Sequence, residues 1–379
     1  MLLTEEYLLI QESTRSLAEK MIRPYVDEWE RTQTFPLSAI EALGRAGFLG
    51  MLVPEQFAGS ASNNLAFVLS VAEIAKACGS ISTIMSVHNS LVCAPILKFG
   101  TQAQKEQFLI PLARGEKLGA FCLTEPQAGS DAANCQTTAT HHGDTFVLNG
   151  VKQFVTNGKH ADIAIVFAKT DSNSKQQGLS AFIVPTNTKG FEVAKIEHKM
   201  GQHASETAQI ILDDCHVPAA YLLGSQGQGY KIALGNLEGG RLGIAAQSVG
   251  MAEEALRLSI QYAKERKTFD KFLYQHQAIS FKLADMATKL EAAKQLLYHA
   301  AMLRDANIPC LKEASMAKLF ASEAAEEICR EAIQIYGGYG YLQDFPLERI
   351  YRDVRVTTIY EGTSEIQRYI ISKELIAGN

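Results

Sequence analysis

The hydrophobic residues recur with a helical period in the first part of this chain. Residues 65–77 and 101–113 combine good helix formers with apolar side chains at helical spacing. Prolines with neighbouring glycines, at Pro36, Pro54 and Pro95, separate such segments. The pattern therefore predicts a helical region from residue 1 to about residue 117.

Between about residues 118 and 222 the pattern changes to short runs rich in β-branched and aromatic residues. Turn-formers such as Asn149-Gly150 separate the runs. The predicted strands are residues 145–148, 163–168, 181–184 and 208–212. Because no crossover helix fits between them, the pattern predicts an antiparallel sheet or a small barrel.

After Gly227 the helical period returns and persists. Apolar residues three and four apart indicate one buried helix face, formed by Leu283, Met286, Leu290, Ala293 and Leu297. Helices are predicted over residues 230–264, 276–305 and 311–336. Long helices with brief connections imply an antiparallel bundle.

The predicted fold class is therefore α+β, with a sheet inserted between two helical parts. We expect an N-terminal helical domain over residues 1–117, an antiparallel β-domain over 118–222 and a C-terminal four-helix-bundle-like domain over 223–379. A chain of 379 residues has room for two or three such units and for a large core.

The composition indicates a soluble globular protein, with 47% hydrophobic residues, 20% charged residues and a net charge of -5. The mild acidic balance argues against nucleic acid as the main partner. Seven scattered cysteines without a Cys-x-x-Cys pair predict reduced thiols and no metal site. Most of them are expected to be small core residues.

The first residues of the chain show no secretory signal, because residues 1–6 lack a basic and an apolar region. No run reaches the ~18 consecutive apolar residues of a membrane-spanning helix. We therefore expect a cytoplasmic protein, or an organelle protein that has already been processed.

A carboxylate near the end of the chain, Glu361, is followed by Gly362 just before an expected helix. Ser364 and Gln367 have the spacing of a capping box, which predicts that a helix begins there. The helix N-terminus favours an ionised carboxylate, whereas enclosure by an apolar ligand disfavours it. That balance suits a general base, and the alternative is a solvated capping carboxylate.

Five segments, in this order, resemble the acyl-CoA dehydrogenase family over essentially the full length. They are Phe121 to Asp131, Phe154 to Gly158, Glu265 to Phe269 continuing to His276-Gln277, Gln334 to Gly340, and the Glu361 segment. The resemblance implies that the chain binds FAD between its β-domain and its C-terminal bundle.

The resemblance assigns two sets of FAD contacts. Those near the flavin ring and a phosphate are Phe121, Leu123, Thr124, Gly129, Ser130, Phe154 and Thr156, with Thr363 and Glu365 as further nucleotide contacts. Those to the adenine-nucleotide half are Arg266, Thr268, Phe269, His276, Gln277, Gln334, Gly337 and Gly338. In the family this second set reaches the FAD of a neighbouring subunit, which implies a homotetramer, a dimer of dimers. Phe154 departs from the family, which commonly has Trp there.

The resemblance also assigns the chemistry. Glu361 matches the family's base, which removes the pro-R α-proton while flavin N5 takes a hydride from Cβ. Expected substrate contacts are Ser130, Glu238, Arg241, Tyr360 and Gly362. In isovaleryl and long-chain members the base lies before an Arg at the position of Gly240, which cannot act as a base. His203 stands where many relatives have Arg.

The function implied is dehydrogenation of a short straight or branched acyl-CoA to trans-2-enoyl-CoA, in β-oxidation or branched amino acid catabolism. Electrons would pass to electron-transfer flavoprotein. Two alternatives are an oxygen-reducing acyl-CoA oxidase and a non-catalytic binding protein on the same fold. The sequence leaves butyryl, isobutyryl and 2-methylbutyryl groups open, because the depth of the pocket is not encoded in a local pattern.

Overall fold

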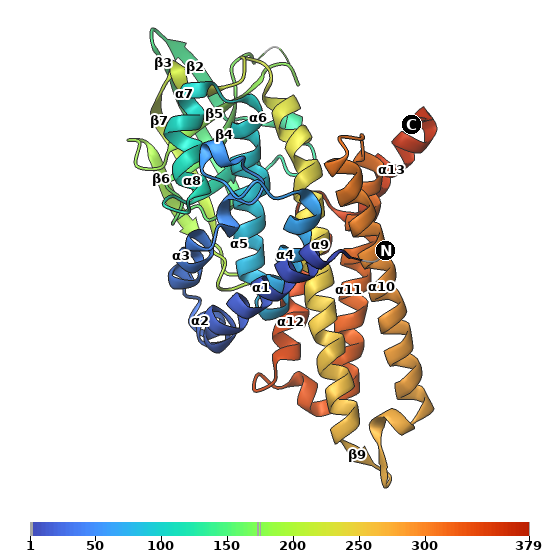
Figure 1. Ribbon diagram of the computed structural model, residues 1–379. Helices are drawn as coiled ribbons and strands as arrows, with labels where there is room; N and C mark the ends of the chain where they lie inside the picture. The colour runs from blue at the N-terminus through green and yellow to red at the C-terminus, as the bar shows by residue number, and fades with distance from the viewer. Residues whose placement is uncertain (1–2, 173, 175, 379) are drawn as a thin grey trace.

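The computed structural model describes residues 3–172, 174 and 176–378. A β-domain lies beside the N-terminal helices, and the C-terminal helices extend away from both to a tip at β9 (Figure 1). Helices cover the N-terminal and C-terminal parts, and strands form the middle, so the fold class predicted from the sequence is confirmed.

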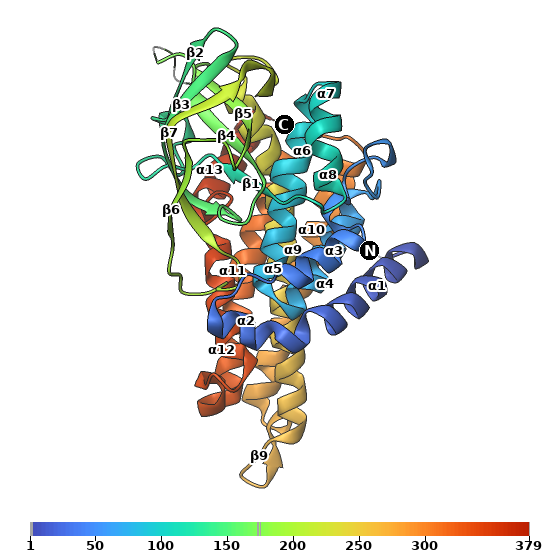
Figure 2. The same cartoon turned by 90° about the vertical axis from the view of Figure 1, so that its left-hand side faces the viewer.

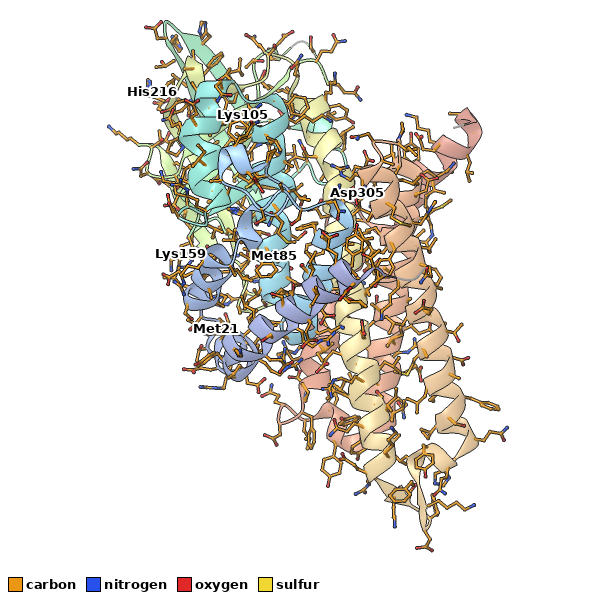
Figure 3. The ribbon with its side chains drawn as sticks, viewed as in Figure 1. Met21, Met85, Lys105, Lys159, His216 and Asp305 are labelled. Carbon is orange, nitrogen blue, oxygen red and sulfur yellow. The ribbon has the colours of Figure 1, made fainter. Side chains whose placement is uncertain are left out.

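The N-terminal part is helical, as predicted. Its helices are α1 (Glu5–Met21), α2 (Val26–Thr32), α3 (Leu37–Arg45), α4 (Asn64–Ala77), α5 (Gly79–Val87), α6 (Ala94–Phe99), α7 (Gln102–Gln104) and α8 (Ile110–Ala113). Helix α4 is buried on almost every face because it packs against α1, α9 and α10. A helix that is apolar all round belongs in a core. Met85 on α5 is fully buried, and Asp305 of α10 binds the amides of Asn64 and Leu65 at the start of α4 (Figure 3).

The stretch Gly79–Phe99 is continuous helix, with a π-helical turn at His88–Cys93 between α5 and α6. It is long and apolar enough to cross a membrane, but 89% of its most apolar window is buried inside the protein. The sequence pattern did not single it out, because Ser, Thr, His and Asn interrupt its apolar run. We assign it as a core helix.

The middle part forms one eight-stranded sheet in the order β6-β7-β3-β2-β4-β5-β8, with β1 beside β4 (Figure 2). The strands are β1 (Gly119–Cys122), β2 (Thr138–His142), β3 (Thr145–Thr156), β4 (Ile163–Lys169), β5 (Leu179–Pro185), β6 (Phe191–Ile196), β7 (Thr207–Pro218) and β8 (Leu222–Leu223). Most neighbours are antiparallel as predicted, whereas β1 and β2 both run parallel to β4. The sheet is therefore mixed.

The C-terminal part is a bundle of three long helices with two shorter ones. They are α9 (Gly229–Glu265), α10 (Gln277–Asp305), α11 (Leu311–Tyr336), α12 (Pro346–Val354) and α13 (Ser364–Ala377), with the hairpin β9 (Lys267–Thr268) and β10 (Lys271–Phe272) after α9. The long helices match the predicted ones within two residues. Met286, Leu290, Ala293 and Leu297 are buried along one face of α10, as the pattern predicted. All seven cysteines are buried free thiols.

Candidate active site

Glu361 lies on a tight turn between a 3₁₀ turn (Arg355–Thr358) and α13. The φ angles of Glu361 and Gly362 are 56° and 89°, so two consecutive residues are left-handed. This conformation is strained for glutamate and persists only where its surroundings enforce it. Gln367 donates to the carbonyls of Glu361 (3.1 Å) and Gly362 (2.9 Å), and the Nζ of Lys318 donates to the carbonyl of Gly362 (2.8 Å). The turn is thus held from two sides.

Helix α13 begins where the sequence predicted, but its cap differs. The N-cap is Thr363, whose hydroxyl accepts from the amide of Ile366 (3.3 Å), and Ser364 is the first helical residue. Gln367 uses its side-chain amide on the Glu361 turn rather than in a capping box. The predicted Ser364–Gln367 capping box was wrong, because tertiary contacts recruit Gln367.

The Glu361 carboxylate lies directly against Gly240 of α9. A Cβ placed on Gly240 would stand 2.8 Å from the Cδ of Glu361, so only glycine allows this approach. Oε2 of Glu361 is buried and has no hydrogen-bond partner among the described residues. Burial raises the pKa of Glu361 to about 7, against the opposing charges of Arg241 and Lys318.

Arg241, the neighbour of Gly240, is 3% exposed. Its Nε and Nη1 have no hydrogen-bond partner within the described part of the chain. Burial lowers the pKa of Arg241, and the carboxylates of Glu361 and Glu238 oppose that effect. Buried polar groups in native proteins are nearly always paired, so unpaired ones mark the place of water or ligand. Such atoms also occur on Ser364 and Gln367, which concentrates them around the Glu361 turn.

Glu238 lies near this cluster but is not paired with Arg241. Its Oε1 accepts from the thiol of Cys310 (2.9 Å) and lies 3.7 Å from the guanidinium of Arg304. Although Glu238 and Arg241 are three residues apart on α9, Glu238 therefore makes its contacts with residues outside that helix.

Tyr360 anchors the turn through its hydroxyl. That hydroxyl donates to Gln247 of α9, lies 3.3 Å from the hydroxyl of Thr83 of α5, and is 3.4 Å from the amide of Gln202 in the β-domain. Burial raises the pKa of Tyr360 to about 12, so it remains a neutral phenol. This network joins the three parts of the molecule immediately before Glu361. His203, the residue that stands where many relatives have Arg, lies beside this network. Its ring nitrogens lie 3.2 Å from the carbonyl of Glu30 and 2.9 Å from the carbonyl of Lys199.

A buried ion pair between Lys152 and Glu125 holds the segment that follows β1. Lys152 and Glu125 are almost completely buried, and Nζ lies 2.7 Å from Oε1. Glu125 also accepts from the thiol of Cys135 and the amide of Thr137. Burial acts to raise the pKa of Glu125, but the Lys152 charge and these bonds outweigh it and lower that pKa to about 2. Nζ of Lys152 also reaches the carbonyl of Leu123 (3.4 Å).

The residues expected near the flavin ring fit a flat aromatic cofactor. Phe154 is 63% exposed with a φ of 57°, at a bulge where the register of β3 shifts between Lys152 and Val155. A bulky residue in this strained conformation indicates a functional constraint. Nothing lies within 4 Å of a Cβ placed on Gly129, so a ligand can approach the backbone there.

The remaining members of the first set have less distinctive surroundings. Phe121 packs edge-on against Phe167, with ring centroids 5.0 Å apart. Leu123, Thr124 and Thr156 are half-buried. Ser130 and Glu365 are exposed.

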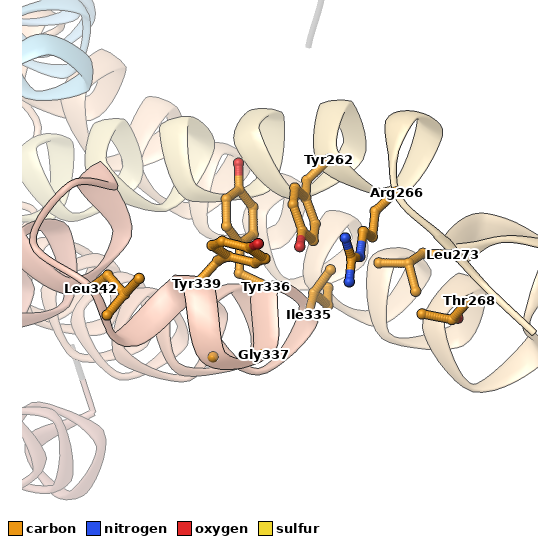
Figure 4. A pocket seen from close by; sticks show the side chains of 10 residues that line it. Tyr262, Arg266, Thr268, Leu273, Ile335, Tyr336, Gly337, Tyr339 and Leu342 are labelled. Atoms are coloured by element: carbon orange, nitrogen blue, oxygen red, sulfur yellow. The ribbon is translucent and has the colours of Figure 1, made fainter.

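Four of the eight residues expected to contact the adenine nucleotide, Arg266, Thr268, Gly337 and Gly338, line a cavity of about 520 Å³ near the end of α9 (Figure 4). Its lining residues are Tyr262, Arg266, Thr268, Leu273, Ile335, Tyr336, Gly337, Gly338, Tyr339 and Leu342. The guanidinium of Arg266 stands 5.7 Å from the ring centroid of Tyr339. His276 lies behind Thr268, with Nε2 3.2 Å from its hydroxyl, while Phe269, Gln277 and Gln334 are exposed and outside the lining.

The Glu361 turn and the cavity around Arg266 are far apart within one chain. Gly240 lies within α9, and Arg266 is the residue that caps the C-terminal end of this helix. At a rise of ~1.5 Å per residue the two are roughly 39 Å apart. The cavity around Arg266 therefore does not open onto the Glu361 turn of its own chain.

Sequence reasoning missed Lys318, Gln247 and Lys152. Lys318 and Lys152 are fully buried. One signal was available for Lys318, because it lies on the face of α11 that carries the buried Ala314, Ala317 and Ala321. A lysine in an apolar stripe is rarely buried without a partner.

Three family models match the chain. They are described as the acyl-CoA dehydrogenase N-terminal domain (residues 4–116), middle domain (residues 120–215) and C-terminal domain (residues 227–376). The exact domain boundaries at residues 117/118 and 222/223 stay a prediction.

Two curated relatives match nearly the whole chain. An acyl-CoA dehydrogenase of Bacillus subtilis is 48% identical over 375 residues, covering 99% of both chains. The mitochondrial short-chain specific acyl-CoA dehydrogenase of Mus musculus is 46% identical over 374 residues, covering 99% of this chain and 91% of the relative.

Solved structures show the same fold. Butyryl-CoA dehydrogenase of Megasphaera elsdenii has a TM-score of 0.97 and 43% identity, covering 99% of both chains. A chain from a structure of the electron transferring flavoprotein of Acidaminococcus fermentans has a TM-score of 0.98 and 45% identity, also covering 99% of both. A glutaryl-CoA dehydrogenase of Mycobacterium smegmatis in complex with FADH2 has a TM-score of 0.94 and 31% identity, covering 100% of this chain and 96% of that one.

Proposed function

Because the chain belongs to the acyl-CoA dehydrogenase family, and is therefore an oxidoreductase that dehydrogenates acyl-CoA, we propose a finer assignment. The enzyme converts a short straight or branched acyl-CoA to trans-2-enoyl-CoA, with Glu361 as the base and FAD as the cofactor. The observation that carries this proposal is the Glu361 carboxylate, which lies buried over Gly240 with Oε2 unpartnered.

Glu361 has the properties that proton removal from a carbon acid requires. A solvated carboxylate near pKa ~4.3 is a weak base, whereas a pKa near neutrality balances basicity against ionisation. Burial raises the pKa of Glu361 to about 7, and Arg241 and Lys318 keep part of the population ionised. Oε2 is free to accept the α-proton, because no described group donates to it.

The cofactor assignment rests on the family and on the fit of Phe154 and Gly129. FAD, when bound, supplies the hydride acceptor for the substrate's β-carbon. Phe154 would cover one face of the ring, and Thr124 and Thr156 would lie at its edge. The Lys152–Glu125 pair would hold the segment that contains Thr124 in place while the ring binds.

The short acyl group is supported by tight packing of α5 against α9. A Cβ placed on Gly243 would come within 3.2 Å of the Cβ of Ser86, one turn beyond Gly240. One further turn along, Gln247 donates to Thr83 (2.6 Å). Contacts this close within two turns of the base support a short tail and disfavour a long one.

The same proposal includes partners and location. The cavity around Arg266, remote from Glu361 in its own chain, supports a homotetramer in which that cavity serves the FAD of a neighbouring subunit. Electron-transfer flavoprotein would take the electrons, as in the family. The enzyme would work in the bacterial cytoplasm or, in a eukaryote, in the mitochondrial matrix. Sedimentation of the FAD-loaded protein tests the assembly, and cell fractionation tests the location.

Anaerobic mixing of the yellow protein with butyryl-CoA, isobutyryl-CoA, 2-methylbutyryl-CoA and a long-chain acyl-CoA tests the function. We expect bleaching of the flavin band to be fastest with one of the three short substrates. Fastest bleaching by the long-chain substrate would overturn the short-chain assignment, and no bleaching by any of them would overturn the function. Peroxide formation that matches substrate consumption would identify an oxidase instead.

A further inference from the structure

Lys318 is a fully buried lysine next to the Glu361 turn. It lies on α11, in a row of buried alanines and serines, and is 0% exposed. Its ammonium donates to the carbonyl of Gly362 at 2.8 Å, the one acceptor it has among the described residues. Burying an ammonium is costly unless charge and hydrogen bonds compensate it. Among the acidic groups that act on Lys318, the Glu361 carboxylate has the largest electrostatic effect, and it compensates the buried ammonium charge.

The charges around Glu361 come from several elements. Arg241 faces it from α9 and Lys318 from α11, while the neutral hydroxyl of Tyr360 belongs to its own segment. Glu238 acts on Arg241, and Glu323 and Glu365 act on Lys318. Two buried cations therefore share one buried carboxylate, and the more remote acids balance the excess positive charge.

We propose that Lys318 is a positioning residue for the base: its ammonium holds the strained Glu361–Gly362 turn, and its charge keeps the Glu361 carboxylate ionised until substrate arrives. The inference rests on the function proposed above. Arg241 alone does not do both tasks, because its Nε and Nη1 make no hydrogen bond to the turn. Gln367 holds the turn without adding a charge.

Burial lowers the pKa of Lys318 to about 8, so the side chain is an ammonium while Glu361 titrates near 7. Removing that charge makes ionisation of Glu361 harder. The acid limb of kcat/KM reports the base of the free enzyme, so this limb is where the effect appears.

The test is Lys318→Met, which keeps an unbranched side chain of similar length and removes both the charge and the donor. We expect the acid limb of kcat/KM to move up by about one pH unit, which is about a tenfold loss on the acidic side. At alkaline pH only the smaller, pH-independent loss from the missing hydrogen bond to the Gly362 carbonyl should remain. A uniform loss at every pH, or an unmoved acid limb, would overturn the proposal. Lys318→Gln, which keeps a donor without the charge, should shift the limb similarly and serves if the Met variant does not fold.

A measurement without turnover follows the same protonation. The infrared band of a protonated carboxylic acid, assigned by its loss in Glu361→Gln, reports Glu361 directly. In Lys318→Met the band should persist to higher pH than in the wild type, and an unchanged titration overturns the proposal. If no acyl-CoA reduces the wild-type flavin, the proposed function fails, while this titration still decides whether Lys318 controls Glu361.

The matched control is Lys294→Met. Lys294 is a partly buried lysine on α10 that pairs with Glu253 of α9 at 3.0 Å, away from the Glu361 turn. Its loss should lower the melting temperature slightly and leave the acid limb in place. A limb that moves as far in this control as in Lys318→Met would show a general charge effect and overturn the assignment to Lys318.

Discussion

Glu125 and Glu361 are both buried carboxylates that face buried cations, yet their surroundings differ in kind. Glu125 lies 2.7 Å from Lys152 and accepts several further hydrogen bonds, and its pKa is lowered to about 2. Glu361 has an unpartnered Oε2 and a left-handed backbone, and its pKa is raised to about 7. Full pairing locks the first carboxylate in one charge state, whereas incomplete pairing leaves the second ready to exchange a proton.

The same contrast extends to the cations. The ammonium of Lys152 donates to the Glu125 carboxylate and to the carbonyl of Leu123. Arg241, by contrast, has two guanidinium nitrogens without a hydrogen-bond partner among the described residues. A satisfied buried ionic cluster makes a rigid support, and an unsatisfied one marks a place where ligand chemistry occurs. The following predictions test whether this division between support and chemistry holds.

The largest effect is expected from Glu361→Gln. The change keeps size and shape but removes the base, so the rate of flavin bleaching by acyl-CoA should fall by about 10²–10⁴-fold. FAD content should stay near the wild-type value, because Oε2 has no hydrogen-bond partner among the described residues to lose. The melting temperature should fall, because Arg241 and Lys318 lose the carboxylate charge that compensates them. Stopped-flow absorbance under anaerobic conditions measures the rate, and near-normal bleaching would remove Glu361 from its role.

Lys152→Met should act on stability rather than on chemistry. It leaves the Glu125 carboxylate buried without its counter-ion, which costs about 3–5 kcal/mol. Denaturant unfolding of the apoprotein measures the loss. Arg45→Met, which breaks an exposed 3.7 Å pair with Glu41, is the control and should cost less than ~0.5 kcal/mol. Equal losses in the two variants would contradict the supporting role of Lys152.

Gly240→Ala should disturb the base without unfolding the protein. The added methyl would stand within 3.0 Å of the Glu361 carboxylate, which must move aside because it is the end of a flexible side chain. A displacement of this size costs about 10²-fold in rate. Gly235→Ala on the same helix, with nothing within 4 Å of its new Cβ, should keep full activity. Equal rates for the two alanine variants would refute the close approach.

The smallest effect is expected from Asp353→Asn. Burial, with the charge of Glu30 adding to it, raises the pKa of Asp353 to about 7. A raised carboxyl pKa makes the folded state hold its proton more tightly than the unfolded chain does. This residue's contribution to stability is therefore present at low pH and is lost as pH rises from about 4 through 7.

Asparagine removes that titration and keeps an oxygen for the amide of Gln202. Above pH 7 the variant should be more stable than the wild type, with a smaller difference at pH 5. Thermal unfolding at the two pH values measures the difference. If the stability gained by the variant does not grow with pH, ionisation of Asp353 does not destabilise the folded state, and the prediction is wrong.

Much of the fold was readable in local patterns. The helical period predicted α4, α9, α10 and α11 nearly to the residue, because apolar spacing and helix formers act over a few turns. The strand runs were found in the right places. The local patterns did not predict the parallel pairing of β1 with β4, because this pairing joins segments separated by the whole β2–β3 hairpin.

The sequence by itself determined the order of elements and singled out Glu361 beside Gly362 at a helix start. Only the tertiary structure decided that this carboxylate lies against Gly240, that Arg241 and Lys318 face it, and that Gln367 serves the turn instead of a cap. It also separated the cavity at Arg266 from Glu361 within one chain. The physical reason is range: periodicity and capping depend on neighbours in the chain, whereas burial, charge pairing and pKa depend on which distant segments pack together.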